Sequence, residues 1–234
     1  MTIKYRTAGF TLIELIIVII VLSILGTMTT SYIRIGSQLY THHVALDASL
    51  NDVRFAAERL RRDMTSALGN SIIVQDNCVS YVPVIANAFY GEDFPLYPKT
   101  AQRMTISKAP AAIAGSFAVV NIRSSKELLA GSGHLHPINA YLTKQSQLLF
   151  EQPVSFSSAS TTQRIYFIKE RVEYCFREQQ LHKKVDNGEA VMMADNITGD
   201  FTYQDNQFLN IHYQVLVDGQ EVTIEQTVHI DHQP

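Results

Sequence analysis

The chain has 234 residues, of which 46% are hydrophobic and 18% are charged, and its formal net charge is −3. These proportions exclude a disordered chain and a membrane protein with many spans, and they leave room for one membrane segment and one folded domain. The charge is balanced and no basic tail is present, so no nucleic-acid partner is expected.

The N-terminal part combines a short basic leader with a long apolar run. Lys4 and Arg6 precede the junction between Gly9 and Phe10, and residues 15–33 carry no charge. A helix of this length rises about 28 Å, which is close to the roughly 30 Å hydrocarbon core of a bilayer. Because basic residues before a span favour a cytoplasmic N-terminus, the sequence predicts a single-pass membrane helix whose C-terminal domain lies outside the cytoplasm.

The heptapeptide GFTLIEL at residues 9–15 resembles the type IV prepilin signal, which type IV pilins and type II secretion pseudopilins share. The resemblance implies that a prepilin peptidase cuts after Gly9 and that the new N-terminal residue, Phe10, is methylated. It also implies a leader over 1–9 and a transmembrane and assembly helix over 10–33. Its further implications are an inner-membrane assembly platform and other pilin subunits as partners, and a final place in a pilus.

Glu14 is a carboxylate within this apolar segment. An ionised carboxylate in hydrocarbon costs a few kcal/mol unless it is paired. Cleavage at Gly9 would create the cationic amine of Phe10 at the same level, and a neighbouring helix can present this amine more easily than the same helix can. We therefore interpret Glu14 and Phe10 as the pair that joins subunits. The alternative is a carboxylate at the membrane edge that reaches the headgroups.

Residues 34–69 are predicted to continue the helix beyond the membrane. Apolar residues recur there mostly at spacings of three and four, which indicates one buried helix face. Its members are Leu39, Leu46, Leu50, Val53, Ala57, Leu60, Met64 and Leu68. We expect the helix to run from near Phe10 to Leu68, with Gly69 as a C-cap of positive φ, and Arg59 to pair with Asp63 on another face.

Residues 70–234 are predicted to form a periplasmic domain rich in antiparallel strands. Asp76-Asn77 and Glu178 mark turns between strands, and Asp218-Gly219 marks a two-residue hairpin after an earlier turn at Asp205-Asn206. Residues 85–163 are poorly patterned and are expected to be a loop-rich insertion. The predicted fold class is therefore α+β, with a long N-terminal α-helix packed on an antiparallel β-sheet.

The chain has two cysteines, Cys78 and Cys175. Outside the cytoplasm they would form one structural disulfide, whereas in a cytosolic protein two free thiols would be expected. The predicted orientation favours the disulfide.

No catalytic motif, cofactor site or metal site is expected. His134 and His136 form an HxH pair, and His229, Asp231 and His232 lie close together near the C-terminus, but two or three such residues without further partners do not define a metal site. The chain is therefore expected not to be an enzyme.

The wider layout resembles the large minor pilins of the MSHA (mannose-sensitive haemagglutinin) pilus, of the MshO type. This resemblance rests on AERLRRDMTSALGNSIIV, VEYCF and MADNITGDFTY. It implies a minor subunit in the initiating or tip complex of a fibre. Three alternatives remain at this point: a J-like minor pseudopilin of a type II secretion system, a tip adhesin or binding subunit, and an enzyme anchored by one helix.

Overall fold

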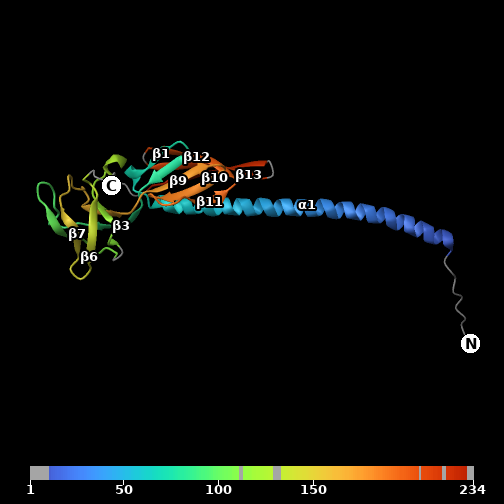
Figure 1. Ribbon diagram of the computed structural model, residues 1–234, viewed down its shortest axis with the longest axis horizontal. Helices are drawn as coiled ribbons and strands as arrows, with labels where there is room; N and C mark the ends of the chain where they lie inside the picture. Colours follow the sequence, from blue (N-terminus) through green and yellow to red (C-terminus); the bar gives the residue numbers. More distant parts are fainter. Residues whose placement is uncertain (1–10, 111–112, 129–132, 206, 218–219, 231–234) are drawn as a thin grey trace, which may run out of the picture. The chain divides into compact units, whose positions relative to one another are not determined.

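The computed structural model describes residues 11–110, 113–128, 133–205, 207–217 and 220–230. The chain divides into two compact units, residues 1–48 and 49–234. Helix α1 (Leu12–Thr65) contributes to both units, and antiparallel strands form the sheets of the second. This arrangement confirms the predicted α+β class (Figure 1).

The end of α1 differs from the prediction. The helix ends at Thr65, and Leu68 is already extended, with φ −72° and ψ 117°. Gly69 begins a short 3₁₀ helix, η1 (Gly69–Ser71), and does not adopt positive φ. The backbone N–H of Leu68 donates to the carbonyl oxygen of Val82 at 3.0 Å, so pairing with a distant segment replaces the last helical turn.

The apolar face predicted for residues 34–69 is buried only in its C-terminal half. Within the second unit, the buried members of this face are Val53, Ala57, Leu60, Met64 and Leu68, together with Ala56 and Ala67, which the spacing did not single out. Leu39, in the first unit, is 55% exposed. Burial therefore begins where the chain enters the second unit.

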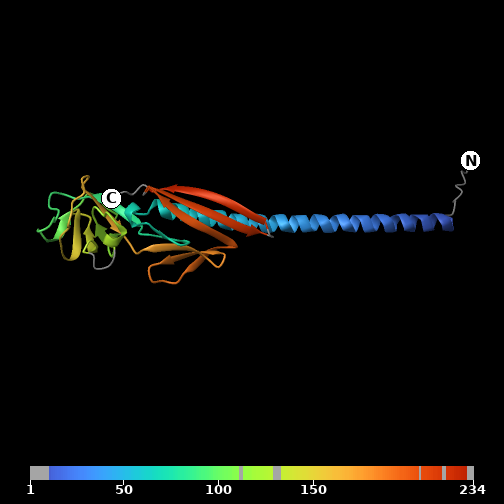
Figure 2. The same ribbon diagram turned by 90° about the horizontal axis from the view of Figure 1, so that it is seen from above.

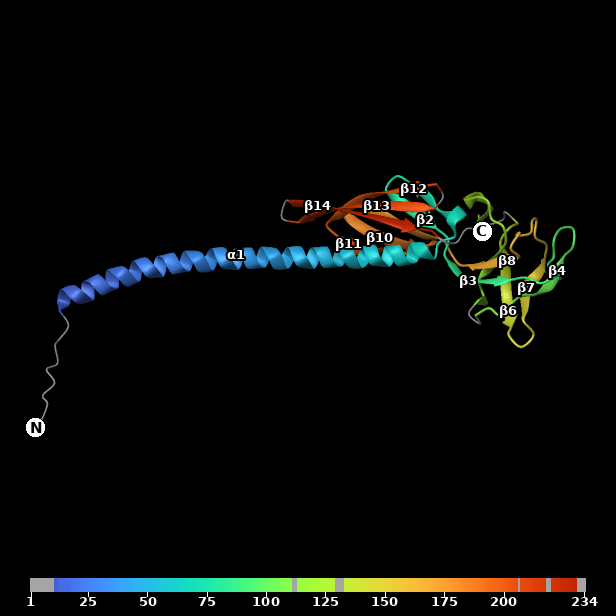
Figure 3. The same ribbon diagram turned by 180° about the vertical axis from the view of Figure 1, so that it is seen from behind.

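A five-stranded antiparallel sheet covers this buried helix face. Its strands are β1 (Ile73–Gln75), β2 (Cys78–Tyr81), β9 (Val172–Arg177), β10 (Gln180–Val185) and β11 (Val191–Asp195), in the order β1-β2-β9-β10-β11. Figures 1 and 3 show β10 and β11 beside the last turns of α1. The turns predicted at Asp76-Asn77 and Glu178 are confirmed, and Asp76 and Glu178 both have φ 52°.

The C-terminal strands β12 (Ile197–Gln204), β13 (Phe208–Val217) and β14 (Gln220–His229) form a three-stranded meander. Val217 pairs with Gln220 across the predicted hairpin, whose turn residues 218–219 lie outside the described residues. The meander packs on the five-stranded sheet, because Phe201 stacks on Phe176 at a centroid distance of 5.0 Å.

The remaining strands form a six-stranded sheet with its own core. They are β3 (Val84–Phe89), β4 (Ala101–Thr105), β5 (Phe117–Val119), β6 (His136–Leu142), β7 (Gln147–Val154) and β8 (Arg164–Ile168), in the order β3-β8-β5-β6-β7-β4, with the 3₁₀ helix η3 (Ser125–Leu128). The edge strands meet at their ends, where Tyr90 bridges to Ile106 and the N–H of Ser107 donates to the carbonyl of Phe89 at 2.7 Å. The sequence predicts loops over residues 85–163, whereas most of this sheet lies there (Figure 2).

The six-stranded sheet is inserted between two paired strands. The chain leaves β2 after Tyr81 and returns into β9 at Val172, and these two residues are direct cross-strand partners. We call residues 82–171 the inserted module. One of its cores includes Met104, Leu148, Phe150, Ile165 and Phe167, each fully buried. A second cluster joins the module to the segment that follows α1, because Leu68 packs there with module residues such as Val84 and Ile168.

Candidate functional site

The predicted processing junction lies outside the described residues. Gly9 and Phe10 belong to residues 1–10, and the described chain begins at Thr11. Cleavage after Gly9 and methylation of Phe10 therefore stay predictions. Glu14, the third residue of the predicted site, lies in the first turn of α1.

The start of α1 has a capping interaction that the sequence analysis missed. Thr11 precedes the helix, and the N–H of Glu14 donates to Thr11 Oγ1 at 3.4 Å. Thr11 and Glu14 have the spacing of a capping box, S/T-x-x-E, so this signal was present in the sequence. A carboxylate in the first turn also interacts favourably with the helix dipole, by about 0.3–1 kcal/mol. That is less than the roughly 2.5–3.5 kcal/mol that a charge costs inside a membrane helix, so capping alone does not offset Glu14 there.

Helix α1 is long and apolar enough to cross a membrane. Large apolar side chains cover its first part, and those between Leu12 and Ile35 are 42–79% exposed. Hydroxyl groups in this region are satisfied by the helix itself: Ser23 Oγ donates to Ile19 O at 2.7 Å, and Thr30 Oγ1 donates to Gly26 O at 2.8 Å. Such hydroxyls need no partner outside the helix, which suits a hydrocarbon environment.

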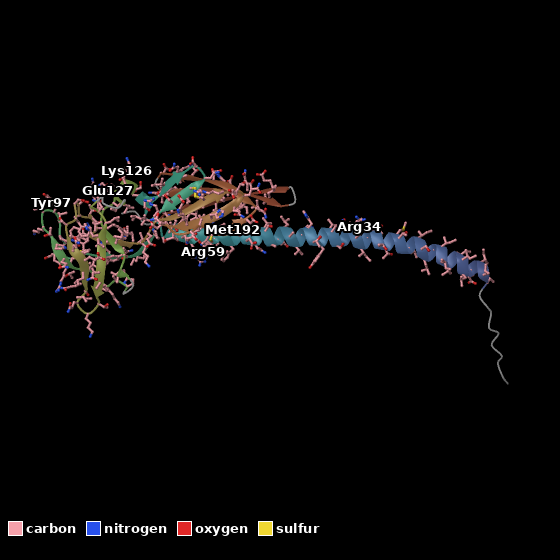
Figure 4. All side chains as sticks on the ribbon, in the orientation of Figure 1. Arg34, Arg59, Tyr97, Lys126, Glu127 and Met192 are labelled. Atoms are coloured by element: carbon pink, nitrogen blue, oxygen red, sulfur yellow. A yellow bond between two sulfur atoms is a disulfide. The ribbon has the colours of Figure 1, made fainter. Side chains whose placement is uncertain are left out.

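The first part of α1 contains a long stretch without charged residues. After Glu14 the next charged residue is Arg34, which is labelled in Figure 4. Glu14 is therefore the one charged side chain between Thr11 and Ile33. If this helix lies in a bilayer, the ionised carboxylate of Glu14 is costly unless a cation pairs with it.

Cys78 and Cys175 are joined in a disulfide, as the sequence predicts for a domain outside the cytoplasm. They are direct cross-strand partners on β2 and β9, the strands between which the module is inserted. Cys175 is buried and Cys78 is half-buried, with Nη2 of Arg177 at 3.8 Å from the sulfur of Cys78. The disulfide therefore fixes the two strands at the base of the module.

Asp63 has a different partner from the one predicted. It does not pair with Arg59; instead its Oδ2 accepts hydrogen bonds from Tyr174 OH, at 2.7 Å, and from Lys183 Nζ. On the exposed side of the helix, Glu58 pairs with Arg61 at 2.7 Å. No local pattern reveals the partners of Asp63, because they lie more than a hundred residues away in the sequence. This ion pair connects α1 to β9 and β10 inside the second unit.

The histidines that the sequence analysis considered, His134, His136 and His229, are not brought together with further metal ligands within the described residues. His136 is buried, with its ring 4.3 Å from that of Phe156, and burial, together with the charge of His134, lowers the pKa of His136 to about 4. His229 lies against Phe208, whereas Asp231 and His232 are outside the described residues. His136 is thus a neutral core residue.

One comparison with known proteins identifies a family motif in the N-terminal part of the chain. The family described as "Prokaryotic N-terminal methylation motif" matches residues 4–30, which include the predicted junction, Glu14 and most of the apolar run. No curated protein and no solved structure matches the chain.

The matched motif and the apolar helix together support a type IV pilin-like or pseudopilin-like subunit. A motif of this kind indicates a structural subunit rather than an enzyme. It also indicates processing by a prepilin peptidase, anchoring in a membrane before assembly, and assembly with other pilins.

Proposed function

We propose that the chain is a minor pilin of a type IV pilus of the MSHA type, similar to MshO, and that it acts in the initiating or tip complex. The observation that carries the pilin-like part is the methylation motif at residues 4–30 on a membrane-length apolar helix that contains one carboxylate. The narrower assignment rests on the resemblance of three downstream segments and on the domain that follows the helix. Before assembly the second unit would face the periplasm; afterwards it would belong to the pilus.

In this proposal the peptidase cuts after Gly9, and the methylated amine of Phe10 becomes the cation that Glu14 needs. The amine of the same chain belongs to a residue only four positions before Glu14 in the sequence, and Thr11, between the two, caps the first turn of α1. A neighbouring subunit can bring its own amine to Glu14 without unwinding that turn. Pairing between subunits neutralises two charges in the hydrocarbon layer at once. It also favours one axial position of each subunit's helix relative to its neighbour.

Three variants separate the charge of Glu14 from its capping role. Glu14→Gln removes the charge but keeps a side chain that suits the third position of a capping box. Thr11→Val removes the cap and keeps the charge, and Ser23→Ala removes a hydroxyl that the helix already satisfies. We expect Glu14→Gln to be cleaved, methylated and inserted normally but to be absent from purified fibres, whereas the other two variants enter them.

The readouts are the N-terminal mass of the membrane-bound chain and its quantity in sheared fibres. Normal incorporation of Glu14→Gln would rule out the pairing of Glu14 with Phe10. A mass that retains the leader residues 1–9 in wild-type fibres would rule out the processing step.

A second function, ligand binding at the fibre tip, is favoured by the inserted module. The module has its own six-stranded sheet and one core of its own, and it meets the rest of the unit mainly at a small cluster around Leu68. Because Tyr81 and Val172 are cross-strand partners, replacing residues 82–171 with Asn-Gly would join β2 to β9 through a two-residue turn. Loss of fibres in this variant supports an assembly role, and loss of attachment with normal fibres supports a binding role.

A pseudopilin of a type II secretion system is the other alternative. Deleting the gene for this chain would then abolish secretion of folded enzymes and leave surface pili intact. The MSHA-type proposal predicts the opposite pair of results.

A further inference from the structure

The disulfide lies on the face of the five-stranded sheet that the helix does not cover. Side chains alternate along β9, so Tyr174 points to Asp63 on α1 while Glu173 and Cys175 lie on the opposite face. On that face the register places Cys78, Cys175 and His182 directly opposite one another on β2, β9 and β10. A sulfur pair, a carboxylate and an imidazole are thus gathered on three adjacent strands.

Three members of this group, Cys78, Cys175 and Glu173, lie close together. The sulfur atoms of Cys78 and Cys175 and a carboxylate oxygen of Glu173 all lie within 4.8 Å of one another. Glu173, Cys175 and His182 also line a cavity of about 220 Å³. Nδ1 of His182 is buried and has no hydrogen-bond partner among the described residues. A buried imidazole nitrogen without a partner is costly, and a metal ion is one partner that would satisfy it.

We propose that, when the disulfide is reduced, these residues bind one Zn²⁺ ion, with Cys78, Cys175, Glu173 and His182 as its four ligands. Two thiolates, an imidazole and a carboxylate form a donor set that Zn²⁺ accepts in tetrahedral geometry. Zn–S bonds of about 2.3 Å would hold the two sulfurs roughly 3.8 Å apart, which residues on directly paired strands can reach. His182 would complete the set from the neighbouring strand β10, where it is the direct cross-strand partner of Cys175 and lines the same cavity.

The charges around the site are compatible with this occupant. Reduction creates two thiols beside Arg177, whose Nη2 lies 3.8 Å from the sulfur of Cys78, so a positive charge lies next to the proposed ligands. The other charged residues of the cavity wall are Glu178 and Lys184, which offset one another. With two thiolates and the carboxylate of Glu173 as ligands, the zinc site would carry one net negative charge, and Arg177 beside it would balance that charge.

The metal and the disulfide exclude each other, because both use the same two sulfurs. A disulfide-containing oxidant would convert the zinc form: two Zn–S bonds break, the Cys78–Cys175 bond forms, two electrons pass to the oxidant, and its two sulfurs take up two protons from water. Zn²⁺ is then released. A dithiol reductant and free Zn²⁺ reverse the exchange. Zinc would therefore hold β2 and β9 in register before oxidation occurs, a property independent of the proposed function.

The test uses the full chain in detergent micelles, reduced with a phosphine and freed of metal. We expect Zn²⁺ to bind it in a one-to-one ratio by calorimetry, and Co²⁺ to give the visible spectrum of a tetrahedral site with sulfur ligands. Oxidised wild-type chain should bind Zn²⁺ at least a hundredfold more weakly, because the disulfide occupies both sulfur ligands. His182→Ala should weaken binding by the reduced chain 10–100-fold, and Glu178→Gln, which alters the cavity wall but no ligand, should leave it unchanged.

Two results would overturn the proposal. Equal Zn²⁺ binding by the reduced and oxidised chains would show that the thiols are not ligands. Unchanged affinity in His182→Ala would remove the fourth ligand and with it the four-ligand site.

Discussion

Removing the carboxylate of Asp63 is expected to destabilise the second unit strongly. In the structure Asp63 Oδ2 accepts hydrogen bonds from both Tyr174 OH and Lys183 Nζ. The side chains of Asp63 and Lys183 are only 24% and 18% exposed, and Tyr174 is fully buried. Asp63→Ala would therefore leave a buried hydroxyl and a largely buried ammonium without their acceptor.

The magnitude follows from these two losses. An unsatisfied buried hydroxyl costs about 1–3 kcal/mol, and breaking a fully buried ion pair costs about 3–5 kcal/mol. Lys183 keeps some exposure and can move its charge towards water, so we expect the total to be about 2–4 kcal/mol rather than the sum. For a unit of this size, that corresponds to a fall in Tm of roughly 5–15 °C.

The assay is thermal unfolding of the full chain in detergent micelles, followed by near-ultraviolet circular dichroism of its tyrosines. Glu58→Ala is the matched control on the same helix, because its pair with Arg61 is 45–48% exposed and solvent screens such a pair. Asp63→Leu combined with Lys183→Met should recover part of the lost stability, since no charge is then left unpaired. Equal Tm values for Asp63→Ala and Glu58→Ala would refute the reasoning.

Three further perturbations test other parts of the second unit. Burial lowers the pKa of His136 to about 4, so protonation of this residue opposes folding. The stability of wild type relative to His136→Gln should be fully present above the unfolded pKa of about 6.5, and it should fall as the pH decreases from there to about 4. Denaturant titrations at several pH values measure this difference. Replacing Cys78 and Cys175 with serine should cost about 4–5 kcal/mol in the chain-entropy model, since the disulfide spans 97 residues, and an unchanged urea midpoint would contradict this estimate. Gly199→Ala should loosen the C-terminal meander, because a Cβ there would lie 2.9–3.0 Å from the Phe176 ring and would also clash with a backbone carbonyl. The expected result is faster amide hydrogen exchange confined to β12 and β13. Unchanged exchange would count against the clash.

Features that depend on neighbouring residues could be predicted from the sequence. The strand pairs around Asp76-Asn77 and around Asp218-Gly219 need only turn residues between alternating runs. The burial of Leu60 and Met64 likewise follows from helical spacing alone. Even the cap at Thr11, which the sequence analysis missed, has a local signature.

The inserted module could not be predicted in this way. Its strand β5 has three residues, and its core joins Met104 to Ile165 across more than sixty positions. Strands this short give no clear hydrophobic periodicity in the sequence. The edge strands of the sheet also meet through pairs such as Tyr90 with Ile106, which contribute stability only when distant segments come together. The residues between them therefore look like loops until the fold is known.

What the sequence determined by itself is the N-terminal segment: an apolar run of membrane length, the methylation motif and the position of Glu14 are properties of adjacent residues. The tertiary structure alone decided which residues Asp63 pairs with, how residues 82–171 fold, and that Glu173 and His182 lie beside the two cysteines. The physical reason is the distance along the sequence over which each interaction acts. Hydrophobicity and helix caps act over a few residues, whereas ion pairs, cores and ligand clusters need contacts that only the folded chain brings together.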